Sequence, residues 1–98
     1  MKKEVICTKD AQFVLEGKTE EFQLRYAVNA IQLTEESQCV YEIAIEKWRG
    51  GCLLEKEETG GITFDLKKAV QFLDTLCRNR ITPMCLLEVT DDAFYGII

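Results

Sequence analysis

Two stretches in the first half of the chain alternate between apolar and polar residues with the period of a β-strand. They are residues 22–30 and 39–46. Strict alternation over this length predicts a strand that buries one face against a core. Because the polar break between them, residues 34–38, is short, we expect the two strands to pair antiparallel. That pairing would place Tyr26 and Tyr41 on the same face of the sheet.

Shorter β-prone runs flank these two strands. Residues 3–8 and 12–15 surround Lys9–Asp10, which we interpret as a turn. The two runs are expected either to pair as a hairpin or to leave the first as an edge strand. Residues 52–57 predict a further strand, and their charged residues suit an edge position because charges discourage pairing with other molecules. Two glycine pairs predict tight bends around that strand: Gly50–Gly51 and Gly60–Gly61.

After residue 64 the apolar period becomes helical, which predicts two helices joined by a tight turn. Asp65 is suited to cap the first, because its carboxylate can accept from the free amides of the first turn. Thr82 followed by Pro83 is a start signal for the second. The predicted core stripes are Leu66, Ala69, Val70, Leu73, Leu76 and Cys77 in the first helix, widened by Phe72, and Leu86, Val89 and Ala93 in the second.

Strands followed by helices predict an α+β fold. We expect an antiparallel sheet of 3–5 strands covered by the two C-terminal helices, with the helix that begins near Asp65 lying across the Tyr26 and Tyr41 face. The 98 residues are enough for one domain, residues 1–98, and too few for a second core.

Composition narrows the function classes. The apolar fraction of 47% is ordinary for a globular chain, and the net charge of −5 disfavours nucleic acid as a partner. No apolar run approaches the roughly 20 residues of a membrane span. The basic start of the chain is not followed by the apolar region of an export signal, so we expect a cytoplasmic protein without a membrane partner.

The five cysteines include no C-x-x-C pair, and the chain has no histidine. A zinc site would need scattered thiolates, and a nucleophilic thiol or hydroxyl would lack an imidazole base. No phosphate-binding glycine motif occurs. We therefore expect no cofactor, no metal and no enzymatic activity. The cysteines are interpreted as reduced, buried small hydrophobes, and the alternative is a thiol-based sensor or small-ligand site that uses Cys7, Cys39 or Cys52.

The second helix is acidic. Two short helices with a tight turn have the outline of a helix-turn-helix, but the second carries Glu88, Asp91 and Asp92, and no lysine or arginine follows Pro83. That surface would repel phosphates. The same three carboxylates could bind a divalent cation or serve acid–base chemistry at a concave pocket, but a solvated outer face gives an identical pattern. They are also one of two expected partner-binding surfaces.

Trp48 is the other. It has the opposite parity from Tyr41 and Ile43, and with Val40 and Ala44 it predicts a second apolar patch on the back of the sheet. Either the second helix or the N-terminal strands cover this patch, or Trp48 is an exposed aromatic anchor for a protein partner or for self-association.

Two segments also carry a family resemblance: residues 41–47, and the block Ile81-Thr-Pro-x-x-Leu-x-Glu-Val-x-x-Asp-x-Phe94. With Leu24-Arg25-Tyr26 they resemble a family of small uncharacterised bacterial proteins, a domain of unknown function, over roughly residues 22 to 95. Family members often have histidine and glycine where this chain has Cys85 and Glu42, so a role tied to that histidine would be absent. The resemblance implies this order of elements and an intracellular bacterial setting, and no activity.

These observations together predict a small non-catalytic cytosolic interaction or regulatory module. The expectation rests on the missing catalytic residues, the absence of a basic surface, and the apolar or edge-strand surface that the predicted fold leaves over. The thiol-based sensor is the alternative from another class.

Overall fold

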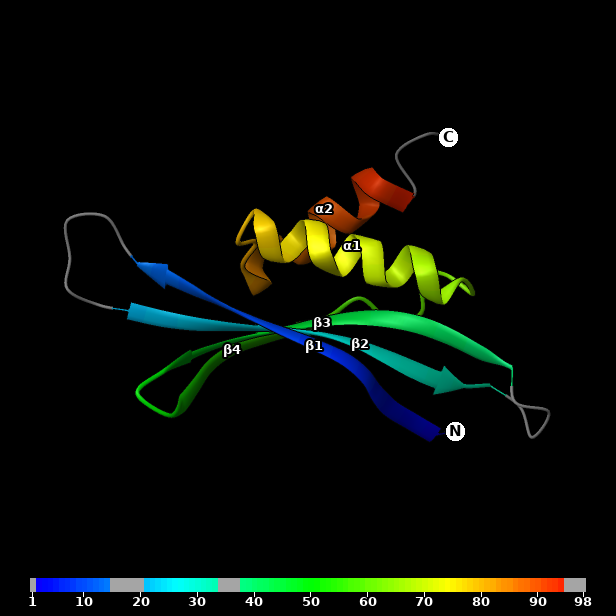
Figure 1. Ribbon diagram of the computed structural model, residues 1–98, viewed down its shortest axis with the longest axis horizontal. Coiled ribbons are helices and arrows are strands. Elements are labelled where there is room, and N and C mark those ends of the chain that lie inside the picture. The colour runs from blue at the N-terminus through cyan, green and yellow to red at the C-terminus, as the bar shows by residue number, and fades with distance from the viewer. Residues whose placement is uncertain (1, 15–20, 34–37, 95–98) are drawn as a thin grey trace.

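The computed structural model describes residues 2–14, 21–33 and 38–94. Four strands form one antiparallel sheet in the order β1-β2-β3-β4, and both helices lie on the same face of it (Figure 1). The predicted α+β fold, an antiparallel sheet under two C-terminal helices, is therefore confirmed. In chain order the elements are β1 (Lys2–Val14), β2 (Glu21–Gln32), β3 (Cys39–Arg49), β4 (Cys52–Glu58), α1 (Leu66–Arg78) and α2 (Pro83–Phe94).

The two central strands follow the alternation in the sequence. Tyr26 pairs with Ile45, and Ala30 pairs with Tyr41, so the predicted antiparallel register and shared face of the tyrosines are confirmed. α1 packs over β1, β2 and β3, and α2 packs over β3 and β4. Each large side chain fully buried between the layers contributes roughly 1.5–3 kcal/mol. This core consists of Leu24, Tyr26, Val28, Ile43, Ile45, Ala69, Leu73, Leu76 and Leu86.

The N-terminal strand differs from the prediction. β1 is continuous, and Lys9 and Asp10 pair with Tyr26 and Arg25 of β2 instead of forming a turn. Both charges have distant partners: Lys9 forms an ion pair with Asp74 of α1, and Asp10 forms one with Arg25. The predicted hairpin between residues 3–8 and 12–15 is therefore wrong. The alternative, in which the first run is an edge strand, is confirmed. Leu15 and most of the break at residues 34–38 lie outside the described residues.

The helices begin where the capping signals predict. The Asp65 carboxylate accepts from the backbone amides of Lys67 and Lys68, at 2.9 and 3.4 Å. Pro83 is the first residue of α2. At the turn between the helices, the Ile81 carbonyl accepts a 2.9 Å hydrogen bond from the buried Tyr26 hydroxyl, which ties the helical layer to β2. Neither described helix has the length and apolar character needed to cross a membrane.

The expectation of buried cysteines is wrong. Cys52 and Cys85 are exposed, and the other three, Cys7, Cys39 and Cys77, are half-buried. All five lie in the described residues, and no disulfide joins any two of them. Cys52 is exposed because it follows the β3–β4 turn, and Cys85 because it lies on a face of α2 that turns away from the sheet.

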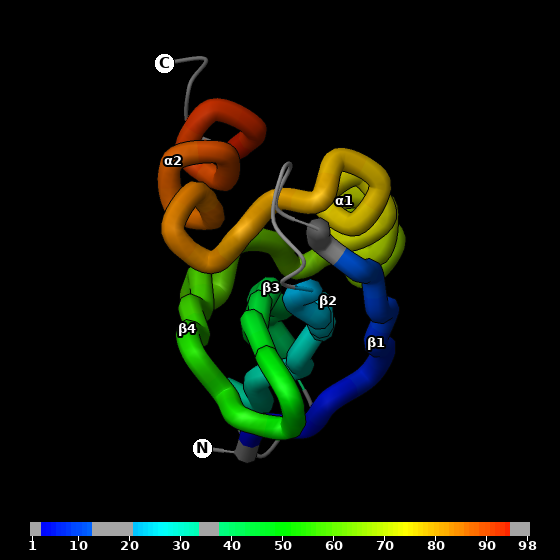
Figure 2. The backbone as a smooth tube through the Cα atoms, turned by 90° about the vertical axis from the view of Figure 1, so that its left-hand side faces the viewer, coloured from blue at the N-terminus to red at the C-terminus, as the bar shows by residue number. Residues whose placement is uncertain are grey.

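The face of the sheet opposite the helices, here called the open face, has no layer of secondary structure among the described residues (Figure 1). Figure 2 shows the edge strands β1 and β4 curving on either side of β2 and β3, as the right-handed twist of strands requires. At one end of the open face this curvature buries polar residues, Asn29 and Glu42, and at the other it leaves a groove.

Candidate functional site

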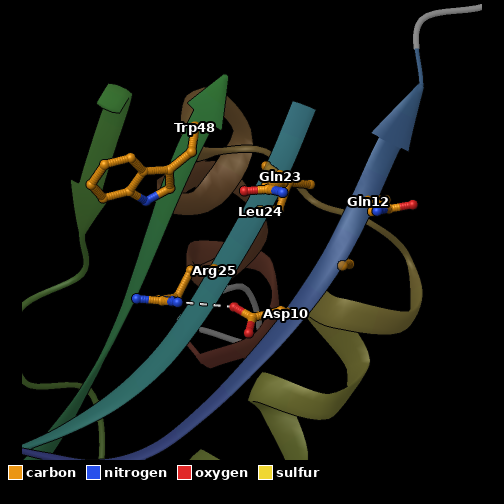
Figure 3. Close-up of a pocket in the computed structure, with 7 residues that line it drawn as sticks. Asp10, Gln12, Gln23, Leu24, Arg25 and Trp48 are labelled. Atoms are coloured by element: carbon orange, nitrogen blue, oxygen red, sulfur yellow. Dashed lines mark hydrogen bonds and ion pairs between the residues drawn. The ribbon is translucent and has the colours of Figure 1, made fainter. Parts of the chain in front are cut away.

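The groove has a volume of about 450 Å³ and lies at the end of the open face where β3 turns into β4. Its side chains come from three neighbouring strands, and the helices lie behind the sheet in this view (Figure 3). A volume of this size is within the range of ligand pockets, roughly 300–1,000 Å³. It is lined by Asp10, Ala11 and Gln12 of β1, Gln23, Leu24 and Arg25 of β2, and Trp48 of β3.

Strand register brings the polar residues of the groove together in rows across the sheet. Gln12 pairs with Gln23, and Gln23 pairs with Trp48, so two amides and an indole follow one another on β1, β2 and β3. Each amide offers two donors and an acceptor oxygen, and the indole offers an apolar face. This row can therefore bind a ligand that has both hydrogen-bonding groups and apolar surface.

The next row is a ladder of alternating charge. Asp10 pairs with Arg25, Arg25 with Glu46, and Glu46 with Lys56, one residue from each strand. Arg25 Nε lies 3.2 Å from Asp10 Oδ1, and Lys56 Nζ lies 3.9 Å from Glu46 Oε2. The Trp48 indole N–H donates to Glu46 Oε1 at 3.4 Å, which fixes the ring beside the ladder. Since each charge has an opposite neighbour, the groove carries no net charge from this row.

The structure places Trp48 where its parity predicted, on the open face. It is half-buried, and both helices lie on the other face, so the expectation that the second helix covers it is wrong. The N-terminal strand contributes to the lining of the same groove through Asp10 and Gln12. Of the predicted back patch, Ala44 is buried, and Val40 lies against Gly61 after β4.

The other predicted site residues do not join the groove. Glu88, Asp91 and Asp92 are exposed on α2, on the helical side of the sheet. Within the described part of the chain, no three or more histidine, cysteine, aspartate or glutamate side chains gather as metal ligands. The three candidate cysteines also lie apart from one another. Cys39 is the first residue of β3, and Cys52 of β4 pairs with Arg49 at the opposite end of β3. Cys7 of β1 pairs with Val28 of β2.

Sequence reasoning did not predict the polar cluster at the opposite end of the open face. Lys3 Nζ of β1 lies 3.0 Å from Glu42 Oε2 of β3 and 3.1 Å from Glu58 Oε2 of β4. Asn29 Nδ2 of β2 donates to Glu42 Oε2 at 2.8 Å. The hydrogen bonds to Glu42 and Glu58 raise the pKa of Lys3, and the hydrogen bond from Lys3 lowers the pKa of Glu58.

Only part of this cluster left a signal in the sequence. Glu42 occupies the polar phase of an alternating strand, which predicts solvent exposure, yet it is 2% exposed. The curvature of the sheet buries it, and a hydrophobic pattern carries no information about curvature. The family resemblance also leads one to expect glycine at position 42, where this chain has glutamate.

No curated protein matches the chain, and no solved structure matches it. The model of a family of unknown function, DUF6514, matches residues 2–95, and the protein therefore belongs to that family.

Proposed function

We propose that the protein is a non-catalytic cytoplasmic binding module that holds a segment of a partner polypeptide in the groove at Trp48. The observation that carries the proposal is the groove itself, about 450 Å³ on the face that neither helix covers, with a half-buried tryptophan in its wall. Tryptophan is among the residue types that contribute most to protein interfaces.

The chemistry of the groove favours a polypeptide over a charged ligand. Its cation, Arg25, is already bonded to Asp10, so a phosphate or a nucleic acid would have to compete with that pair. Gln12 and Gln23 suit the amide groups of a peptide backbone, and Trp48 suits an apolar side chain of the same segment. The volume corresponds to a few side chains, as a short docking segment would need.

The same residues support a binding role over catalysis. Glutamine amides do not ionise near neutral pH, and the Asp10 carboxylate that lines the groove already accepts a hydrogen bond from the guanidinium of Arg25.

A photo-crosslinking amino acid at position 23 tests the location of the partner. Its matched control is the same amino acid at position 68, because Lys68 is also exposed but lies on α1, on the other side of the sheet. We expect a discrete adduct with another protein from position 23 and none from position 68. The adduct should be lost in Trp48→Ala and retained in Trp48→Phe, with both variants checked for unchanged thermal unfolding.

The outcomes distinguish the occupants. An adduct at twice the mass of this chain would identify self-association through the groove and contradict the hetero-partner. Equal labelling from positions 23 and 68, or an adduct that survives Trp48→Ala, would contradict the groove as the docking surface.

The thiol-based sensor is the second candidate from the sequence. An exposed Cys52 is the feature that favours it, since accessible thiols are the ones that oxidise. Because Cys7, Cys39 and Cys52 lie apart, such a sensor would have to act through one thiol at a time.

A further inference from the structure

The helix α1 ends in a hydrogen-bonded motif that usually has glycine where this chain has Arg80. The Ile81 amide donates to the Leu76 carbonyl at 3.1 Å, and the Arg80 amide donates to the Cys77 carbonyl at 3.2 Å. These two bonds close the helix as a Schellman motif, which needs a left-handed backbone at the residue in the position of Arg80. The φ of Arg80 is 50°, and among the described residues no other non-glycine residue has a positive φ.

A side chain at this position is unfavourable for the backbone. The Cβ atom is crowded in the left-handed conformation, and glycine avoids that crowding. A non-glycine residue remains in such a conformation where other contacts hold it. The Arg80 side chain makes one of these contacts, because its Nε donates to the Gln12 carbonyl of β1 at 3.0 Å. Glycine would relieve the backbone, but it would lose this bond.

The contacts from the end of α1 reach β1 at the segment that forms one wall of the groove. Asp10 and Gln12 both line the groove. Their carbonyl groups are two residues apart in a strand, so they point to the same side of it. Cys77 Sγ lies 4.0 Å from the Asp10 carbonyl oxygen, and Arg80 bonds the Gln12 carbonyl. Since β1 is an edge strand, the helical layer thus covers two carbonyls on its outer edge.

We propose that Arg80 is a positioning residue for the groove, which holds the Gln12 segment of β1 in place from the helical side of the sheet. Gln12 and Trp48 stand on either side of Gln23 in one row, so the width of the groove depends on where β1 lies. Within the sheet β1 pairs with β2 alone, and the bond from Arg80 supplies a second attachment. The inference rests on the proposed function for its effect on partner binding, but the attachment of β1 can be measured without a partner.

Native-state amide exchange followed by NMR tests this attachment. Arg80→Gly and Arg80→Ala both remove the bond to Gln12, but glycine also relieves the left-handed backbone. We expect the Ala11 amide, beside Gln12, to exchange roughly fivefold faster in both variants, the factor that corresponds to one lost hydrogen bond. The Glu4 amide, near the other end of the same strand, should not change. Urea unfolding should show Arg80→Gly to be more stable than Arg80→Ala, so that equal exchange at Ala11 reports the local bond and not global stability.

Arg78→Ala provides the matched control. Arg78 is an exposed arginine two residues away, and its Nε pairs with Asp74 of the same helix at 3.4 Å. Its loss should leave exchange at Ala11 unchanged. The effect on binding is measured with the photo-crosslinking amino acid at position 23. We expect the yield of the partner adduct to fall severalfold in Arg80→Gly and to be retained in Arg78→Ala.

The outcomes separate this inference from the proposed function. The role of Arg80 is overturned if exchange at Ala11 is unchanged in Arg80→Gly, or if Arg78→Ala accelerates it equally. It is also overturned if Arg80→Gly gives the full yield of the adduct. A wild type that gives no adduct from position 23 would contradict the proposed function, and exchange at Ala11 would still decide whether Arg80 holds β1.

Discussion

The hydrogen bond between Tyr26 and Ile81 is the contact whose loss we expect to be most informative about the fold. Tyr26 is fully buried on β2, and its hydroxyl donates at 2.9 Å to a carbonyl in the turn that joins α1 to α2. Tyr26→Phe keeps the ring in the core and removes this one group. The change therefore probes how firmly the turn between the helices is attached to the sheet.

The expected cost follows from the chemistry of the lost bond. A hydrogen bond within a protein contributes about 1 kcal/mol net, and an acceptor left without a donor adds to that. Because Ile81 is half-buried and water can reach it in part, we expect a total loss of roughly 1.5 kcal/mol in the free energy of unfolding. For a domain of this size that corresponds to a fall in Tm of about 6–12 °C.

Urea unfolding followed by circular dichroism measures the change, and Tyr41→Phe is the matched control. Tyr41 packs against the same core, but its hydroxyl has no hydrogen bond among the described residues. Its removal should cost less than about 0.5 kcal/mol. An equal effect of the two substitutions, or a stabilised Tyr26→Phe, would refute the assignment of this hydrogen bond as the link between the layers.

The same residue makes a prediction about alkaline pH. Burial raises the pKa of Tyr26 above its ordinary value of 10.0, so the phenol stays neutral in the folded state while it ionises in the unfolded state. The unfolded chain then binds fewer protons, and stability falls as pH rises above that value. Tyr26→Phe should reduce this alkaline loss.

Three further changes test local features. Gly61→Ala would bring a methyl group within 2.7 Å of Val40 Cγ2, so we expect a loss of about 1–3 kcal/mol in urea unfolding that Val40→Ala in the same chain partly restores. Asp65→Ala removes the cap of α1 and should cost about 1 kcal/mol, whereas Asp65→Asn should retain most of the stability. Cys52 and Cys85 are exposed and should alkylate first under native conditions, as mass spectrometry can follow; if no thiol reacts, the sensor hypothesis fails.

The central strands and both helices could be predicted because their signals are local. One-sided burial leaves an alternating pattern along β2 and β3, and the caps at Asp65 and Pro83 mark where helical backbone begins. β1 could not be predicted in the same way. Lys9 and Asp10 resemble a turn locally, but Asp74 and Arg25 neutralise them within a continuous strand. A local pattern cannot show a partner that lies distant in the sequence.

The groove was predictable only at one residue. The parity of Trp48 on β3 places it on the open face without any knowledge of the neighbouring strands. Gln23 meets it through the register between β2 and β3. Gln12 joins them through the register between β1 and β2, which depends on an irregularity between Val5 and Cys7. A shift of one residue would have turned these side chains toward the core. Site residues set by register are therefore beyond the reach of periodicity.

The contrast between the two ends of the open face follows from the twist of a single sheet. Where the edge strands curve toward each other, Lys3 of β1 reaches Glu58 of β4, and the residues beneath them are buried. At the other end the face remains open beside Trp48. The Lys3–Glu58 ion pair favours the curved form of the sheet, because flattening would separate its two charges.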